Sequence, residues 1–215
     1  MDWTVETARG LKWETLESRQ LALFDEVRAA PERRYLLVSE PRPTFTCGRS
    51  GLMADLLWSS IEREARGVGI AQVTRGGKWT YHGPGQILVY PIARLAGLGY
   101  PSRAVHRYLG DLRAGVADFL SEQGLMPELS DSPFGVYVNR KKIASFGVAI
   151  QRGVSLHGVA LYLEPQTPAF QGIHPCGVPG ECFTSLSEEG VALPWEKAAE
   201  RLASAVKKAF KRPKS

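Results

Sequence analysis

Three strand-like runs follow one another between residues 135 and 163, separated only by short breaks. They cover residues 135–138, 143–151 and 155–163, and each is rich in β-branched and small apolar residues. The first break, at Asn139-Arg140, suits the turn of a β-hairpin. Consecutive strands joined by tight turns pair antiparallel, so this stretch predicts an antiparallel or mixed sheet.

Three other stretches repeat apolar residues at helical spacing, namely residues 16–29, 103–122 and 195–210. Further strand-like runs cover residues 35–39, 70–74 and 87–91. Strands grouped with packed helices predict an α+β fold. The chain has 215 residues, of which 44% are hydrophobic, and shows no linker or repeat. We therefore expect residues 1–215 to form a single domain around one core.

The net charge of +5 is concentrated at the carboxyl-terminal end. Five basic residues and no acid follow position 206: Lys207, Lys208, Lys211, Arg212 and Lys214. Basic residues suit the end of a helix, and the neutral remainder gives no support to nucleic-acid binding. The first residues lack a basic start, and no run approaches about 18 apolar residues. We expect a cytoplasmic protein with no membrane association.

Cys176 stands between Pro175 and Gly177, in a stretch where prolines and glycines favour a loop. A cysteine used only for packing is normally found in an apolar strand or helix. Backbone N–H groups in such a loop can polarise an oxyanion. Cys176 is therefore a candidate nucleophile.

A thiol needs a base or a cation nearby to act as a nucleophile at neutral pH. His174 is the local candidate, because residues two apart share a face in an extended segment. A packing role or a substrate contact for His174 remains open. The three cysteines are an odd number, which argues against a disulfide framework, and the spacing of Cys176 and Cys182 does not suit a zinc ligand pair.

A second informative block runs from Arg75 to Gln86, with the sequence Arg-Gly-Gly-Lys-Trp-Thr-Tyr-His-Gly-Pro-Gly-Gln. Its glycines allow the backbone to approach a ligand closely, and its polar side chains offer several kinds of donor. We interpret it as a substrate-binding loop; the alternative is a surface turn between two strands. The spacing fits neither the dinucleotide fingerprint nor the P-loop.

Three segments together resemble the octanoyltransferases, also called lipoyl(octanoyl) transferases. They are residues 75–86, residues 135–147 continuing into 152–161, and Ile173-His-Pro-Cys-Gly177 with Thr184-Ser185-Leu186. Weaker similarity begins near residue 45, so the resemblance covers roughly residues 35–186. It implies the biotin/lipoate-protein ligase type of fold.

The resemblance implies transfer of an octanoyl or lipoyl group from acyl carrier protein to a lysine of a lipoyl domain, the first step of endogenous protein lipoylation. The acceptors would be 2-oxoacid dehydrogenases or the glycine cleavage H protein. Transfer would pass through a cysteine thioester and need no cofactor, nucleotide or metal. Two rival classes remain open: an ATP-dependent lipoate or biotin ligase, and a non-catalytic lipoyl- or acyl-binding protein.

The resemblance also assigns the site. It implies a dyad of Cys176 with Lys142, which spacing alone does not select over a solvated lysine. The residues implied to line the acyl pocket are Arg75, Gly76, Gly77, Lys78, Trp79, Thr80, Tyr81, His82, Ser145, Phe146, Gly147, Gly158, Val159 and Ala160. The chain departs from the family pattern at residues 162–166 and at Val178-Pro179, which flank the nucleophile.

Overall fold

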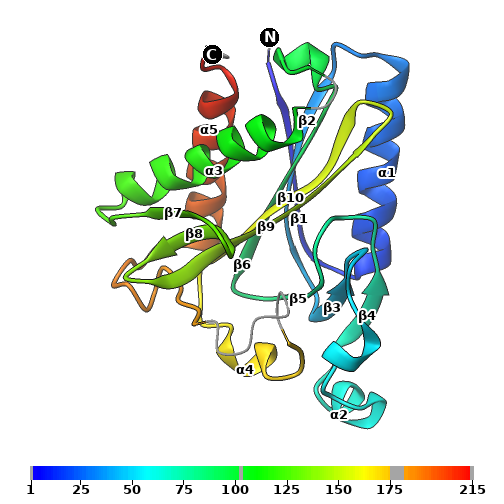
Figure 1. Cartoon of the computed structure of the whole chain (residues 1–215), viewed down its shortest axis with the longest axis vertical. Helices are drawn as coiled ribbons and strands as arrows, with labels where there is room; N and C mark the ends of the chain where they lie inside the picture. Colours follow the sequence, from blue (N-terminus) through cyan, green and yellow to red (C-terminus); the bar gives the residue numbers. More distant parts are fainter. Residues whose placement is uncertain (1, 102–103, 175–181, 214–215) are drawn as a thin grey trace.

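The computed structural model describes residues 2–101, 104–174 and 182–213. Its centre is a seven-stranded sheet with the order β1-β2-β6-β10-β9-β8-β7 (Figure 1). The strands are β1 (Thr4–Leu11), β2 (Arg34–Pro41), β6 (Gln86–Ala93), β7 (Glu128–Asp131), β8 (Phe134–Val138), β9 (Lys141–Gln151) and β10 (Val154–Tyr162). β1 and β2 are parallel and the other neighbours are antiparallel, so the sheet is mixed, as the sequence predicts.

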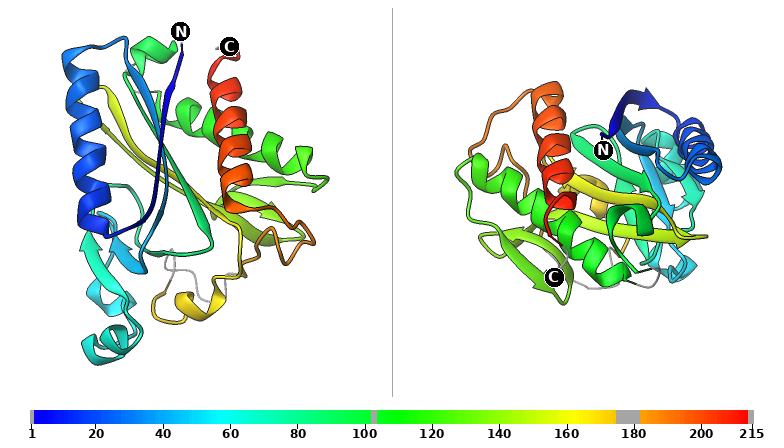
Figure 2. Two further views of the ribbon diagram at one scale, coloured as in Figure 1. Left: turned by 180° about the vertical axis from the view of Figure 1, so that it is seen from behind. Right: turned by 90° about the horizontal axis from the view of Figure 1, so that it is seen from above.

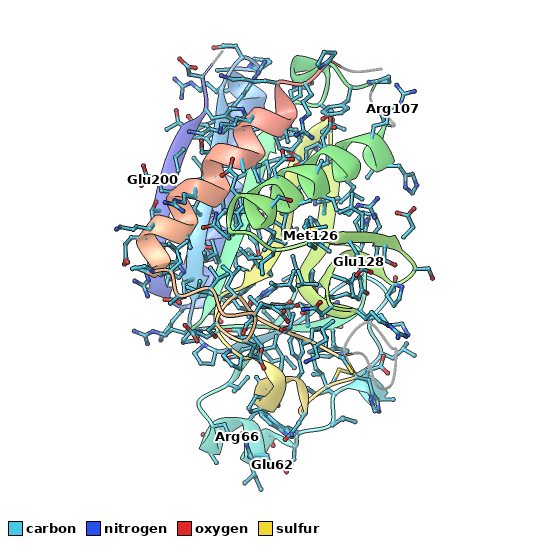
Figure 3. The ribbon with its side chains drawn as sticks, turned by 90° about the vertical axis from the view of Figure 1, so that its left-hand side faces the viewer. Glu62, Arg66, Arg107, Met126, Glu128 and Glu200 are labelled. Carbon is cyan, nitrogen blue, oxygen red and sulfur yellow. The ribbon has the colours of Figure 1, made fainter. Side chains whose placement is uncertain are left out.

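A three-stranded sheet with the order β4-β3-β5 lies beside the main one (Figure 1). It consists of β3 (Thr44–Cys47), β4 (Gly69–Gln72) and β5 (Trp79–His82). The short helices η1 (Met53–Asp55) and α2 (Ser60–Ala65) connect β3 to β4, and Ser59 with Glu62 forms a capping box at the start of α2. Glu62 and Arg66 mark the end of the molecule that also carries α4 (Thr167–Phe170) (Figure 3).

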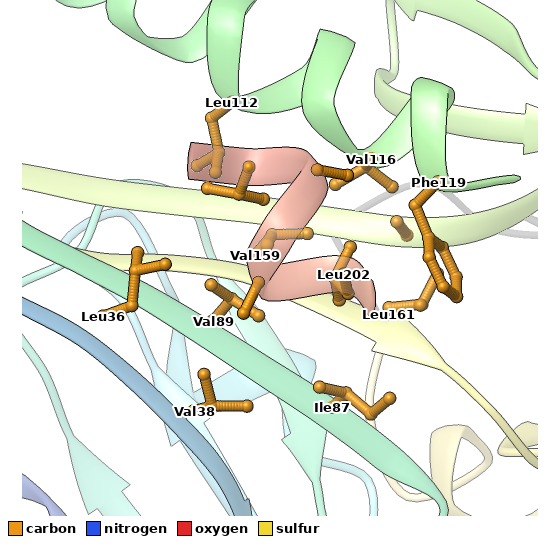
Figure 4. Packing of buried hydrophobic residues seen from close by; sticks show 14 of the residues in the cluster. Leu36, Val38, Ile87, Val89, Leu112, Val116, Phe119, Val159, Leu161 and Leu202 are labelled. Atoms are coloured by element: carbon orange, nitrogen blue, oxygen red, sulfur yellow. The ribbon is translucent and has the colours of Figure 1, made fainter. Parts of the chain in front are cut away.

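Helices cover both faces of the main sheet (Figure 2). α1 (Trp13–Ala29) packs on one face, while α3 (Val105–Glu122) and α5 (Trp195–Phe210) pack on the other; the short η2 (Ala96–Leu98) follows β6. Because side chains alternate along a strand, Leu36 and Val38 join the α3–α5 core, whereas Tyr35 and Leu37 join the α1 core. Figure 4 shows the first of these cores.

The sequence predicts α1, α3 and α5 together with β2, β4, β6, β8, β9 and β10. α1 begins at Trp13 rather than Leu16. Four strands, β1, β3, β5 and β7, were not predicted. β1 and β7 are edge strands with many exposed positions, so their apolar pattern is weak. β5 has only four residues and lies inside the glycine-rich block.

The basic end of the chain is part of the fold. The carboxyl-terminal end of α5 lies at the end of the molecule opposite α4 (Figure 1). Phe210 is buried, and its ring stacks on two others. Its ring centroid is 5.2 Å from that of Tyr108 and 5.6 Å from that of Trp3. None of the helices within the described ranges is long and apolar enough to cross a membrane.

Gly158 of β10 should not tolerate a side chain. A Cβ built there would lie 2.1 Å from the backbone oxygen of Val89 and 3.0 Å from Pro91 Cδ, and backbone atoms in the sheet cannot easily move away. We expect Gly158→Ala to lower the free energy of unfolding by about 2–4 kcal/mol, measured by urea denaturation. Gly110→Ala is the matched control: its Cβ would meet nothing within 4 Å, inside α3, so it should add about 0.5–1 kcal/mol. Equal stability of the two variants would contradict this account of β10.

Candidate active site

A cavity of about 60 Å³, partly open to solvent, lies between residues 75–82 and the strands β9 and β10. The residues that line it are Arg75, Gly76, Gly77, Lys78, Trp79, Thr80, His82, Tyr90, Ser145, Phe146, Gly147, Gly158, Val159 and Ala160. The structure thus brings together around one cavity every pocket residue named from the sequence except Tyr81.

Tyr81 and Tyr90 are the two differences from the sequence prediction. The ring of Tyr81 packs instead among Phe45 and Phe170, at centroid distances of 5.9 and 6.3 Å. Tyr90 of β6 lines the cavity but was missed, because it lies outside the glycine-rich block. Its place in a fully buried strand is the signal that could have indicated a role in the interior.

The backbone of residues 48–50 holds the glycine-rich loop in place. Gly48 N donates to Lys78 O at 3.0 Å, and Ser50 N donates to Gly77 O at 3.1 Å. Gly77 has a φ of +86°, and a Cβ at Gly48 would lie 2.3 Å from Gly77 O, so glycine is required at both positions. The loop is therefore fixed by contacts that need no side chain.

Arg75 ties this loop to β3. It is 7% exposed, and its Nη2 donates to both the backbone oxygen and Oγ1 of Thr46 at 2.8 Å. Its Nη1 donates to Gly76 O at 3.0 Å. Arg75 borders the cavity, but these bonds use its guanidinium to hold protein backbone.

One wall of the cavity is an irregular part of β10. His157 has a φ of +57°, unusual for a residue other than glycine, and its N–H donates to Oε1 of buried Gln20 at 2.6 Å. Its Nε2 is 3.2 Å from Thr74 Oγ1. Gln20 of α1 therefore satisfies a backbone donor that the sheet does not, at the residue before Gly158.

Hydrogen bonds of Gln86 indicate which ring nitrogen of His82 carries the proton. Gln86 donates through Nε2 to Tyr81 O at 3.1 Å, so its Oε1 faces His82 Nδ1 at 3.2 Å, and that nitrogen carries the proton. The ring stacks on Trp13 at 5.3 Å. Burial, assisted by the charge of Arg75, lowers the pKa of His82 to about 3, and the same causes lower the pKa of His157 to about 3. Both histidines are neutral at pH 7.

Lys142, at the start of β9, is fully buried. Its Nζ lies 5.4 Å from the centre of the Tyr137 ring, and its Cε passes so close to Gly135 that a Cβ there would be 2.8 Å away. Lys142 N donates to Cys182 O at 2.8 Å, and Thr184 N donates to Lys142 O at 2.9 Å. A solvated lysine, the alternative for this residue, is not what the structure has.

Cys176, the predicted nucleophile, lies outside the described residues. Described residues on both sides of it are anchored. His174 N donates to Asp55 O at 2.8 Å, and His174 is exposed. The rings of Phe170 and Phe183 stack with centroids 4.2 Å apart, which joins the two flanks of residues 175–181 to each other.

Of the other cysteines, Cys47 is buried and Cys182 is exposed. Burial raises the pKa of Cys47, which suits an inert thiol. In the described part of the chain, no three His, Cys, Asp or Glu side chains form a group that could hold a metal ion.

Comparison with known proteins identifies the family. The model of the lipoyl protein ligase A/B catalytic domain matches residues 17–207. A protein named "Probable octanoyltransferase" from Pyrobaculum arsenaticum is 39% identical over 169 residues, which cover 79% of this chain and 74% of that protein. An octanoyltransferase from Citrifermentans bemidjiense is 38% identical over 170 residues, which cover 79% and 78%.

Solved structures share the fold at low sequence identity. A bipartite lipoate protein ligase from Thermoplasma acidophilum matches with a TM-score of 0.74 and 13% identity, covering 97% of this chain and 84% of that one. Lipoate-protein ligase A bound with ATP matches with a TM-score of 0.74 and 15% identity, over 97% and 84%. The architecture is therefore that of the lipoate-protein ligase fold, as expected.

Together with the cavity, this fold defines a catalytic domain of the lipoate-protein ligase type. Given a family model that matches most of the chain and relatives above 30% identity, the chain belongs to the lipoyl protein ligase A/B catalytic-domain family and, within it, to the octanoyltransferases, which are acyltransferases.

The two buried histidines should make the fold sensitive to acid. Their pKa values of about 3 lie below the value of about 6.5 for an unfolded histidine, so the unfolded chain binds more protons within that window. The stability that comes from keeping these two histidines neutral is therefore present above pH 6.5 and is lost as the pH falls from there towards 3. Between pH 7.5 and 5.5 each histidine should remove about 1.4 kcal/mol from the free energy of unfolding.

His82→Phe, which keeps a ring against Trp13, should halve this histidine-dependent loss in urea denaturation at the two pH values. His106→Gln, at an exposed position of α3, should leave the pH dependence unchanged. If His82→Phe retained the full dependence of the original protein, a neutral His82 would not be part of the folded state.

Proposed function

We propose that this acyltransferase moves an octanoyl or lipoyl group from acyl carrier protein to a lysine of a lipoyl domain, through a thioester on Cys176. The acceptors would be the lipoyl domains of 2-oxoacid dehydrogenases or the glycine cleavage H protein. Residues 1–215 would act as one catalytic domain. The lining of the cavity, apolar at Trp79, Phe146 and Val159, suits a medium acyl chain.

The reaction would have two steps. Lys142 accepts the proton of the Cys176 thiol, the sulfur attacks the thioester carbonyl, and the thiol of the donor leaves with a proton. The acceptor amine then attacks the acyl-enzyme, Lys142 takes the amine proton, and the Cys176 thiol is restored. Backbone N–H groups near Gly177 would hold the oxyanion in both steps.

The observation that carries this proposal is the pairing of Lys142 with the end of the segment that contains Cys176. Two backbone hydrogen bonds join Lys142 to Cys182 and Thr184, only a few residues beyond the nucleophile. The stack of Phe170 on Phe183 supports the same arrangement, because it draws the flanks of residues 175–181 together. A lysine needed only for solubility would not be fully buried.

The rival ligase reaction would use the same fold, since lipoate-protein ligase A bound with ATP matches it. That reaction would activate a free acid with nucleotide and would not need Cys176. Transfer from an acyl thioester without ATP distinguishes the two reactions, and turnover also separates an enzyme from a binding protein.

The acyl-enzyme should be visible by intact mass spectrometry. Incubation with octanoyl-acyl carrier protein should add one octanoyl group that hydroxylamine removes, and Cys176→Ala should abolish both the adduct and transfer. Cys47→Ala and Cys182→Ala should retain most of the activity, since the thiol of Cys47 is buried with a raised pKa and the backbone oxygen of Cys182, which bonds Lys142, is kept by alanine. Full transfer by Cys176→Ala would end the covalent mechanism.

Lys142 should set the reactivity of Cys176. Lys142→Met removes the amine but keeps a buried chain of similar length, so the packing against Gly135 should survive. Alkylation of Cys176, followed by peptide mass spectrometry, should slow at neutral pH and recover in part as the pH rises. His174→Gln should alkylate at the original rate, because His174 is exposed. The reverse pattern would assign the base role to His174.

A further inference from the structure

One carboxylate joins the two segments that hold Lys142. Glu189 Oε1 accepts a hydrogen bond from Thr184 Oγ1 at 2.6 Å, and its Oε2 accepts one from Asn139 Nδ2 at 2.7 Å. Asn139 lies in the turn that leads into β9, and Thr184 lies in the segment paired with Lys142. Glu189 therefore connects the chain just before Lys142 to the chain just beyond Cys182.

At Lys142 the partner of β9 changes on the side that faces away from β8. The pairing of β9 with β10 ends at Ala144 opposite Leu161. Nearer the start of β9, segment 182–184 replaces β10 as the neighbour, through a single parallel bridge between Lys142 and Phe183. Two backbone hydrogen bonds fix that bridge, and Leu186 N, a little further along the same segment, donates to Tyr162 O at the end of β10. Side-chain contacts of this segment with the β8–β9 turn add to the same register.

The two partners of Glu189 differ in burial, because Thr184 is buried and Asn139 is exposed in a tight turn. Thr184 is 2% exposed, so its hydroxyl needs a partner within the protein. Asn139 and Arg140 have φ values of +50° and +65°, as the two central residues of a type I′ turn require. The backbone of such a turn fixes the direction of the Asn139 Cα–Cβ bond, and the carboxylate of Glu189 accepts from both partners at once.

We propose that Glu189 is a positioning residue, which holds Lys142 in register with the segment that follows the nucleophile and so sets how Lys142 meets the Cys176 thiol. The inference rests on the proposed function, because it takes Lys142 and Cys176 as the reacting pair. In this role Glu189 acts through its hydrogen bonds with Asn139 and Thr184.

Glu188 provides a matched control within the same turn. Its Oε2 accepts a hydrogen bond from Ser185 Oγ at 2.8 Å, so it is also a glutamate bonded to a hydroxyl of this segment. That contact is local, within three residues, and does not reach the β8–β9 hairpin. Loss of Glu188 therefore removes a similar bond without releasing the connection across Lys142.

Four variants test the proposal: Glu189→Ala, Glu189→Gln, Asn139→Gly and Glu188→Ala. Asn139→Gly removes the amide but keeps a residue that favours positive φ. In Glu189→Gln the amide oxygen can accept from Asn139, and the amide nitrogen can donate to Thr184. The ring of Tyr137 and the backbone oxygen of Cys182, which contact Lys142 from β8 and from segment 182–184, are kept in all four variants.

The measurements are the pH profile of Cys176 alkylation, the kcat and KM of transfer, and the melting temperature. Glu189→Ala and Asn139→Gly should slow alkylation at pH 7 about tenfold and raise the midpoint of the profile by about one pH unit. They should lower kcat more than they raise KM. Glu189→Gln and Glu188→Ala should both keep the pH profile of alkylation that the original protein has.

An unchanged profile in folded Glu189→Ala or Asn139→Gly would overturn the proposal, as would an equal loss in Glu188→Ala. If Glu189→Ala does not fold, Asn139→Gly decides, because its side chain is exposed. Lys142→Met tests the proposed pair of Lys142 and Cys176 separately from the role of Glu189. Original reactivity in Lys142→Met would refute the dyad itself, whereas slow alkylation in Lys142→Met beside normal alkylation in Asn139→Gly would refute only the role of Glu189.

Discussion

The arrangement around the candidate site depends on burying one lysine. An ammonium group or a neutral amine removed from water is costly unless its surroundings are shaped for it, and Lys142 is fully buried. Gly135 leaves room for its side chain, the face of Tyr137 lies beside its Nζ, and segment 182–184 pairs with its backbone. The first two features lie on β8 and the third on segment 182–184, so the burial of the amine depends on two parts of the chain that meet on either side of β9.

The cavity also depends on buried groups, because buried polar side chains hold its walls through hydrogen bonds to the backbone. Arg75 donates to backbone oxygens of β3 and of its own loop, Gln20 accepts the N–H of His157, and Gln86 orients His82. The atoms named in these hydrogen bonds therefore have protein partners without a ligand. In the proposed function, a frame fixed in this way would hold the acyl chain without rearranging, which would lower the entropy lost on binding.

Periodicity predicted the elements with strong apolar patterns, such as α5, whose bounds agree with the sequence expectation. It missed β5, because four residues among glycines carry too little pattern, and β1, whose exposed edge alternates weakly. The family resemblance grouped residues 75–82 with β9 and β10, and the structure places them around one cavity. It did not indicate that the Tyr81 side chain points away from the cavity, because that direction follows from its packing against Phe170. The link from Glu189 to Asn139 spans fifty positions, and no local pattern encodes such a contact.

Both ends of the described chain lie at the end of the molecule away from α4 (Figures 1 and 2). The rings of Trp3 and Phe210 stack there at 5.6 Å, so the first strand and the last helix meet directly. A short linker could therefore join them in a circular permutant with little strain. An affinity tag or a surface attachment at either end would extend from the end of the molecule opposite α4, where these two rings meet.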